Sequence, residues 1–385
     1  MQRNTGHGTI RRITIRKCTT AINKGRYTTG ETDPDCINIV IEVSNGKVSG
    51  FGEFVPTSLI YPPGHIGTSA LDEWDITLKT AQNLIGKDCR ILGNWIPEEL
   101  KCHDANSIVD GFDFAIHDLA GHIFNLPATA FLGGRKHDRV WNMDVIRTDE
   151  PDIMAKTALE FQKQRHTRYF KLKPNGEMEK DYETIRKIRE LTLPGSHIFI
   201  DPNYALKEQH PDAVVKYLNR LHELGLEVCE DPIKTDWATF RYIKDRTKVK
   251  IMIDECARSP ESIMAIANAG CADLINIHAN WAGGFQRAML KAGIAAVGGI
   301  ECLVGSTFLL GMGVAGYRIL TSLLPGNLAI CEQENAVYCC QGFTVVKKEY
   351  EELDGASLIP DTPGLGVDVD MDKLEQVTFE TVNVE

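Results

Sequence analysis

The sequence predicts an α/β fold in which a closed β/α barrel follows a smaller α+β unit. From about Arg139 onward, short β-branched runs alternate with helical patterns at intervals of roughly 25 to 30 residues. Eight runs within about 200 residues match the strands of a barrel, whereas a doubly wound sheet would need a Gly-rich phosphate turn after the first run. The runs are VWNMDVIR, RYFKLKP, HIFIDPN, LEVCEDP, KIMIDE, DLINIH, GIAAVGGIECL and NLAICEQ.

The elements before and after the barrel predict a capping unit. Residues 9–22 and 35–56 alternate as strands do, and the second segment contains the hairpin signal Ser-Asn-Gly. A helical stretch from about Ser69 stops at Pro127 and Gly133-Gly134. The tail returns to strand and turn character, so we expect it to pack on the N-terminal unit. The expected domains are residues 1–135 (α+β cap), 136–341 (barrel) and 342–385 (C-terminal segment).

Composition narrows the class of protein. The chain has 385 residues, of which 43% are hydrophobic, and a net charge of −11 without a basic block, which argues against nucleic-acid binding. No run approaches the roughly 20 apolar residues of a membrane span, and the start lacks the apolar core of a signal peptide. The 11 cysteines form no CxxC pair, which favours buried thiols in a reducing compartment. We therefore expect a cytoplasmic protein with neither a membrane nor a nucleic-acid partner.

Polar residues end five successive runs, where a β/α barrel carries its catalytic groups. Capping of turns explains one or two such residues, but it does not easily explain acids at the ends of three successive strands. The ends are Lys171-Leu172-Lys173, Asp201-Pro202-Asn203, Glu230-Asp231-Pro232, Asp254-Glu255 and Asn276-Ile277-His278.

The three acids predict a divalent cation. Adjacent strands lie about 4.8 Å apart, so Asp201, Glu230 and Asp254 should converge. Carboxylates that close repel one another and raise one another's pKa unless a cation neutralises them. An all-oxygen set suits Mg²⁺ or Mn²⁺ rather than zinc. A salt-bridge cluster with the lysines is the alternative.

Lys171, Lys173 and His278 are candidate acid–base groups. The two lysines are two positions apart, so they share the interior face of their strand. Beside a metal and another cation an ammonium pKa falls, which makes a lysine a usable base. His278 is expected four strands onward, across the barrel mouth, and histidine titrates near neutrality. Together these groups suit removal of the α-proton of a metal-bound carboxylate substrate, with a second group returning a proton or assisting a leaving group.

These residues resemble those of the enolase superfamily, specifically its muconate-lactonising and mandelate-racemase-like branches. The segments VDGFDFAIHDLAGHIFNLPATAFLGG and PDTPGLGVDVD resemble the family's capping helix and closing segment. The resemblance implies a (β/α)₇β barrel with a capping domain. It also implies that Asp201, Glu230 and Asp254 are Mg²⁺ ligands, that Lys173 is the base, that Lys171 is its electrostatic neighbour, and that the protein is a homo-oligomer, a dimer or an octamer.

The sequence departs from the family pattern at two strands. NIHANWAGG keeps the frame of the muconate-lactonising sixth strand, including Gly283-Gly284, but His278 stands where a lysine belongs. GIECLVGST lacks the usual Glu-Ser-Ser and has Val304-Gly305-Ser306 instead. The chain therefore falls between the named subgroups.

Substrate recognition is expected from the eighth strand and from capping loops near 24–27 and 56–63. Dipeptide epimerases of this family hold a substrate ammonium with Asp-x-Asp at about this position, so Glu332 and Glu334 could do the same, although a solvated acidic turn explains them equally well. The further candidates for substrate contact are Asn203, Phe54, Tyr61 and Trp281.

The leading hypothesis is a Mg²⁺-dependent racemase or epimerase of an amino-acid derivative, that is, an isomerase acting on a small carboxylate. The alternative is β-elimination by a dehydratase, a lyase acting on a hydroxy acid or on a hydroxyproline-like imino acid such as cis-3-hydroxyproline. A muconate cycloisomerase is less favoured, because the glutamate pair would repel a dicarboxylate. A non-catalytic carboxylate binder is disfavoured by the intact lysines and acids.

Overall fold

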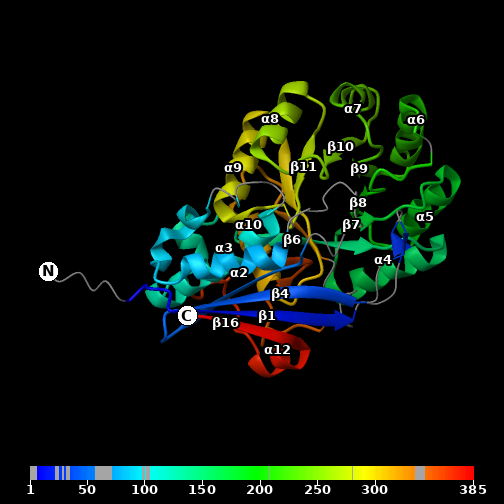
Figure 1. Ribbon diagram of the computed structural model, residues 1–385. Helices are drawn as coiled ribbons and strands as arrows, with labels where there is room; N and C mark the ends of the chain where they lie inside the picture. The colour runs from blue at the N-terminus through cyan, green and yellow to red at the C-terminus, as the bar shows by residue number, and fades with distance from the viewer. Residues whose placement is uncertain are drawn as a thin grey trace.

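The eight strands expected from Arg139 onward form a closed parallel barrel, which confirms the predicted fold class. Figure 1 shows the computed structural model, which describes residues 7–21, 26–27, 30–31, 35–56, 72–97, 100, 105–207, 209–279, 281–333 and 343–385. Each barrel strand pairs with the next one along the chain, and the last pairs with the first to close the ring. The strands are β6 (Arg139–Ile146), β7 (Tyr169–Leu172), β8 (His197–Ile200), β9 (Leu226–Glu230), β10 (Lys250–Ile253), β11 (Leu274–Ile277), β12 (Glu301–Val304) and β13 (Ile330–Gln333).

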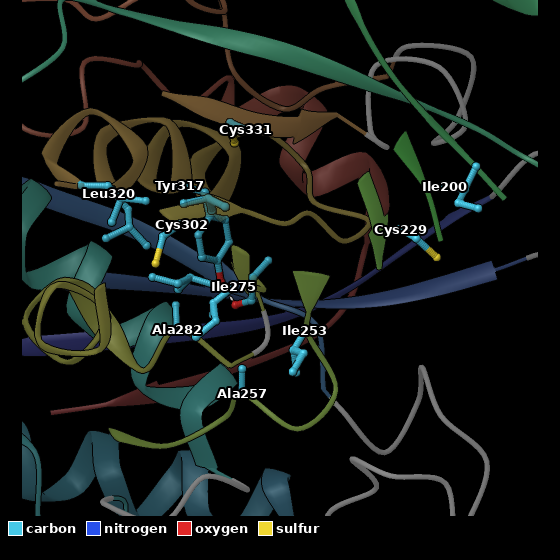
Figure 2. Packing of buried hydrophobic residues seen from close by; sticks show 14 of the residues in the cluster. Ile200, Cys229, Ile253, Ala257, Ile275, Ala282, Cys302, Tyr317, Leu320 and Cys331 are labelled. Carbon is cyan, nitrogen blue, oxygen red and sulfur yellow. Dashed lines mark hydrogen bonds between the residues drawn. The ribbon is translucent and has the colours of Figure 1, made fainter. Parts of the chain in front are cut away.

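A helix connects each barrel strand to the next, as in a (β/α)₇β barrel. Three of these helices begin with proline, whose fixed φ and missing N–H suit a first helical turn. Ile253 and Ile275 of the barrel strands and Tyr317 and Leu320 of the helical layer belong to one cluster of buried apolar side chains (Figure 2). The helices are α4 (Pro151–Arg165), α5 (Met178–Leu191), α6 (Pro211–His222), α7 (Trp237–Lys244), α8 (Pro260–Ala269), α9 (Gly284–Val297) and α10 (Met312–Leu323).

An antiparallel sheet with two α-helices forms the cap. The predicted hairpin joins β4 to β5, and the Asn45 side chain accepts hydrogen bonds from the N–H groups of Lys47 and Val48, both at 2.9 Å. Helix α3 packs on β5 and also on α9 of the barrel, so it is buried along most of its length. The cap consists of β1 (Arg12–Ala21), β4 (Asp35–Ser44), β5 (Ser49–Phe54), β16 (Thr378–Val384), α2 (Glu73–Leu84) and α3 (Asn106–Phe124), with the short 3₁₀ helices η1 (Cys89–Trp95) and η4 (Ala128–Leu132).

The C-terminal segment touches both units. The hairpin of β14 (Glu352–Leu353) and β15 (Ala356–Leu358) adds to β6 of the barrel, whereas α12 (Met371–Val377) lies next to β1 and β16 pairs with β1 of the cap. A small two-stranded sheet, β2 (Arg26–Tyr27) with β3 (Gly30–Glu31), stands apart. The domain bounds at 135/136 and 341/342 stay a prediction. Within the described ranges, none of the helices has the length and apolar character that crossing a membrane requires.

Candidate active site

The barrel interior is filled in layers, and the layer at the strand ends is polar. Alternate residues of a strand face the interior, so residues two apart lie one above the other. An apolar layer comprises Met143, Phe199, Val228, Met252, Leu274, Leu303 and Ile330. Two residues further along five of these strands the interior positions are Asp201, Glu230, Asp254, Asn276 and Glu332, and Lys171 has the same place on β7, after Tyr169.

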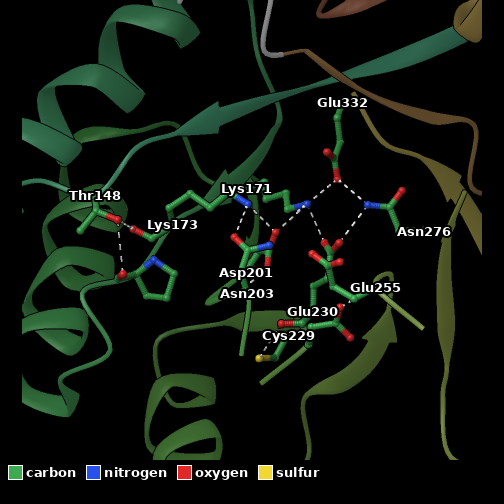
Figure 3. A network of polar contacts seen from close by, with 12 residues as sticks. Thr148, Lys171, Lys173, Asp201, Asn203, Cys229, Glu230, Glu255, Asn276 and Glu332 are labelled. Atoms are coloured by element: carbon green, nitrogen blue, oxygen red, sulfur yellow. Dashed lines mark hydrogen bonds and ion pairs between the residues drawn. The ribbon is translucent and has the colours of Figure 1, made fainter. Parts of the chain in front are cut away.

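Lys171 lies among three carboxylates (Figure 3). Its Nζ is 2.7 Å from Glu230 Oε2, 2.8 Å from Glu332 Oε1 and 3.0 Å from Asp201 Oδ2. Burial alone would lower the pKa of this ammonium group, but the carboxylates outweigh burial and raise the pKa of Lys171 well above its usual value. The expected fall in pKa is therefore absent at Lys171, and this residue is suited to be a fixed positive charge rather than a base.

Lys173 lies one layer closer to the mouth. Its backbone N–H donates to Ile146 O at 2.8 Å, which extends the β6–β7 ladder beyond the strand. Its Nζ is 2.5 Å from Asp201 Oδ2 and 2.9 Å from Asn203 Oδ1. Asn203, predicted to contact substrate, thus binds the amine of the predicted base and would help to orient it.

The three predicted metal ligands end β8, β9 and β10 and are all buried. Burial would raise the pKa of Asp201, but the two lysines outweigh it and lower this pKa below the usual range. Burial and neighbouring carboxylates raise the pKa of Glu230 to about 8 and that of Asp254 well above its usual value. The cluster therefore holds more negative charge than its lysines neutralise.

The oxygen donors of this cluster are of the kind that a divalent cation such as Mg²⁺ binds. Asp254 Oδ1 is buried and accepts no hydrogen bond, and the ligand atoms would all be carboxylate oxygens, as Mg²⁺ prefers. The described residues contain no group of three or more His, Cys, Asp and Glu side chains already arranged around an ion position. The ammonium of Lys171 instead bridges Asp201 and Glu230.

His278 follows β11, across the barrel from β7. Its ring lies 5.8 Å from that of Trp281, with a tilt of 34° between the planes. Burial and the positive charges of Lys171 and Lys173 lower the pKa of His278 to about 3. The imidazole is thus neutral around pH 7, and a neutral imidazole can accept a proton.

The other residues predicted to contact substrate lie in different parts of the structure, and not all of them are at the barrel mouth. Glu332 lies below the mouth, where it binds Lys171 and also accepts from Asn276 Nδ2 at 3.3 Å. Phe54 is in the core of the cap, 1% exposed, among the neighbours of Gly111. The indole of Trp281 is buried between His278 and the guanidinium of Arg258, which lies 4.0 Å from the ring centre. Glu334 and Tyr61 lie outside the described residues, as does most of both capping loops.

Three polar residues of the site have roles that sequence reasoning missed. Asn276 Nδ2 donates to Glu230 Oε1 at 2.9 Å, and its interior position two residues after Leu274 could have revealed it. Asp231 accepts from the N–H of Glu255 at 2.9 Å, which connects the ends of β9 and β10. Arg258 pairs with Glu255 at 3.0 Å, but no periodicity of the sequence points to it.

Comparison with known proteins agrees with this geometry. The family described as "Enolase C-terminal domain-like" matches residues 153–373. Muconate cycloisomerase 1 of Acinetobacter baylyi is 30% identical over 271 residues, which are 68% of this chain and 70% of that protein. The structure of N-succinyl Arg/Lys racemase from Bacillus cereus superposes with a TM-score of 0.83 at 21% identity and covers 98% of this chain and 100% of its own. The structure of a dipeptide epimerase from Cytophaga hutchinsonii, complexed with Mg and the dipeptide D-Ala-L-Val, superposes with a TM-score of 0.81 at 21% identity. The match covers 98% of this chain and 100% of the epimerase chain.

The chain therefore belongs to the family of enolase C-terminal domain-like proteins and is an enzyme of the enolase superfamily. Within that superfamily its relatives are muconate cycloisomerases and the racemases and epimerases of amino-acid derivatives. The predicted resemblance is confirmed at this level.

Proposed function

We propose that the protein removes the α-proton of a small carboxylate and returns a proton on the other face, which racemises or epimerises an amino-acid derivative. One observation carries this proposal: Lys173 and His278 follow β7 and β11, on opposite sides of the barrel, with the acidic cluster between them. Proton transfer on both faces of one carbon needs a group on each side. The racemase and the dipeptide epimerase among the compared structures support the same class of substrate.

The chain's own groups divide the work. Asp201, Glu230 and Asp254 would hold Mg²⁺, whose chemistry when bound is electrostatic stabilisation of negative charge on the substrate carboxylate. Lys173 holds or takes the proton on the β7 side, where Asn203 orients its amine. Lys171 contributes a fixed positive charge beneath the reacting carbon. His278 takes or returns the proton on the β11 side.

Solvent exchange tests the proposal. The protein is incubated with MgCl₂ in D₂O, and loss of the α-hydrogen signal is followed by NMR for the separate enantiomers of N-succinyl-lysine, for L-Ala-L-Val and for cis-3-hydroxyproline. Because cis,cis-muconate has only vinylic hydrogens, it is followed instead by deuterium incorporation into a lactone product. Muconate belongs in the panel because a muconate cycloisomerase is among the relatives of this chain. We expect exchange accompanied by formation of the opposite stereoisomer.

A pair of variants identifies the base. Lys173→Ala should abolish exchange on the β7 side, whereas Lys180→Ala, which alters a surface ion pair with Glu150, should leave it unchanged. Full exchange in Lys173→Ala would refute the assignment. EDTA should stop exchange and Mg²⁺ should restore it.

The same panel separates the dehydratase. Dehydration of a hydroxylated substrate yields a 2-keto acid or an imine, which semicarbazide detects, whereas racemisation yields neither. The low pKa of His278 disfavours this residue as the acid that protonates a leaving hydroxyl, so a dehydratase would use Lys173 for that step. A semicarbazide-positive product without the opposite stereoisomer would replace the proposed reaction with β-elimination.

A further inference from the structure

Helix α3 of the cap contacts the barrel at the first residues of α9. The first N–H groups of a helix have no partner within it and carry the positive end of its dipole. Here the N–H of Gly284 donates to Asp110 Oδ1 at 2.6 Å, and that of Phe285 donates to Asp113 Oδ2 at 2.9 Å. The N-cap residue of α9 is Gly283, which has no side chain to accept these hydrogen bonds. Two carboxylates of the cap accept them instead.

Gly284 permits this approach. Its φ is +79°, and a Cβ placed there would lie 2.8 Å from Asp113 Oδ2. Any L-residue with a side chain would be strained and would also displace the side chain of Asp113. The second glycine of Gly283-Gly284 is therefore needed for contact between the cap and the barrel.

The same cap helix reaches the β11–α9 loop, which we define as residues 278–279 and 281–283. Asn106 Nδ2 donates to Trp281 O at 3.0 Å, and Lys291 Nζ donates to the same carbonyl. The hydroxyl of Tyr317 donates to Ala279 O and lies 3.0 Å from Asp110 Oδ2. The backbone on both sides of the loop is thus held by buried side chains.

The Tyr317 hydroxyl has a single proton, so it cannot donate to both oxygens at once. Burial raises the pKa of Asp110, which favours a protonated carboxyl group that can donate to Tyr317. The arrangement is then a chain of hydrogen bonds from Asp110 through Tyr317 to Ala279 O. Asparagine at position 110 can supply the same donor, but alanine cannot.

The held backbone determines where the imidazole of His278 lies. Ala279 is the next residue, and the N–H of Trp281 donates to His278 O at 2.9 Å. The Trp281 ring packs against the imidazole, and Arg258 covers the ring. On another side, the imidazole Cδ2 is 3.0 Å from the place that a Cβ of Gly305 would occupy. These contacts bound the imidazole on two sides while the loop is held.

We propose that α3 is a positioning element for the acid–base chemistry: Asn106, Asp110 and Asp113 fix the β11–α9 loop so that His278 faces the barrel mouth. This inference rests on the proposed function, in which His278 moves a proton. The competing explanation is that these contacts only stabilise the interface between cap and barrel.

The variants are chosen to separate the two explanations. Asp110→Ala breaks the chain of hydrogen bonds, and Asp110→Asn should preserve it. Tyr317→Phe removes a single oxygen and breaks the same chain of hydrogen bonds, so it is the test variant if Asp110→Ala does not fold. Asp118→Ala is the matched control, because Asp118 is on the same helix but accepts from Phe51 N and Leu365 N, away from the loop.

A substrate-free measurement reads the position of His278. The protein with bound Mg²⁺ is labelled with ¹³Cε1-histidine, and the His278 resonance is assigned by its absence in His278→Asn. We expect the resonance to shift or broaden in Asp110→Ala and Tyr317→Phe and to keep its position in Asp110→Asn and Asp118→Ala. An unchanged resonance in Asp110→Ala and Tyr317→Phe, or an equal change in Asp118→Ala, overturns the proposal.

Exchange of the two enantiomers of N-succinyl-lysine in D₂O gives the second readout. Since displacement of a catalytic group by 1 Å can cost about 10²-fold in rate, Asp110→Ala should slow exchange on the β11 side 10- to 100-fold. Exchange on the β7 side should change less than about 3-fold, and equal losses on both sides would contradict the positioning role. If no probe of the panel exchanges with the native protein while the His278 resonance responds as expected, the proposed function fails. Only the structural part of the inference, that α3 holds His278 in place, then stands.

Discussion

Replacement of Lys171 by methionine should expose how strongly the acidic cluster depends on a cation. Methionine has a similar length but no charge, so Asp201, Glu230 and Glu332 would each lose a partner at 2.7 to 3.0 Å. These carboxylates are at most 4% exposed, and water cannot replace the ammonium. The variant should therefore be less stable than the native protein when no divalent ion is present.

The magnitude follows from the cost of an uncompensated buried charge, about 3–5 kcal/mol. Unfolding entropy is about 2.1 cal/mol/K per residue, or about 0.8 kcal/mol/K for 385 residues, so Tm should fall by about 4–6 °C. A carboxylate can relieve the charge by taking up a proton, and the pKa of Glu230 is already raised to about 8. The loss should therefore be larger at pH 9 than at pH 6.

Differential scanning calorimetry in EDTA measures this loss, and repeating the scan with MgCl₂ measures its recovery. Mg²⁺ at 100 times its Kd should return about 2.7 kcal/mol. The gain should be larger for Lys171→Met than for the native protein, because the ammonium of Lys171 no longer competes for Asp201 and Glu230. Lys180→Met, which breaks an exposed pair, should change stability by less than about 1 kcal/mol. An unchanged Tm in EDTA at pH 9, or no additional effect of Mg²⁺, would refute the reasoning.

Three further predictions concern the β11 side of the site. His278→Asn should slow exchange of the enantiomer that faces His278 at least 100-fold, and a change of no more than twofold would make the histidine structural. The pKa of His278 is lowered from 6.5 to about 3 in the folded protein, so between these pH values the unfolded chain binds a proton that the folded protein does not. The free energy of unfolding should therefore fall by up to about 1.4 kcal/mol per pH unit as the pH falls below 6.5. Urea unfolding at pH 7 and pH 5 should show a smaller fall in His278→Asn than in the native protein, and equal falls would contradict the shift. Gly284→Ala should destabilise the protein by at least about 1 kcal/mol through backbone strain, whereas Gly293→Ala, within α9 and with open space at its Cβ, should be neutral or stabilising.

The period of two along a strand accounts for what could be predicted of the site. It places Lys171 and Lys173 on one face and brings Asp201, Glu230 and Asp254 into adjacent positions, and the structure has all five at the strand ends. The same period also predicts that Glu332 and Glu334 share a face. The period does not give the height of Glu332 along the barrel axis relative to the residues of neighbouring strands, because that height depends on the stagger of the closed barrel.

Phe54 shows a second limit of sequence reasoning. Alternation in β5 requires that Glu53 and Phe54 face opposite sides of the sheet. Hydrophobicity does not reveal that Glu53 is the residue that faces the barrel. The structure shows that Glu53 is fully buried and accepts from the N–H of Leu310 at 2.6 Å, close to the start of α10, so Phe54 faces the core of the cap. A contact between distant elements decided this orientation, and a local pattern does not contain it.

The charges around the site give its two sides different resting states. On the β7 side the amine of Lys173 lies 2.5 Å from Asp201 Oδ2. On the β11 side the positive charges of the lysines and of Arg258 oppose protonation of His278, so this group is ready to accept a proton. A lysine at position 278 would add another cation to the same field, whereas histidine adds a base that is neutral at pH 7. In the proposed function, the histidine that departs from the family pattern would therefore let the β11 side begin as the base.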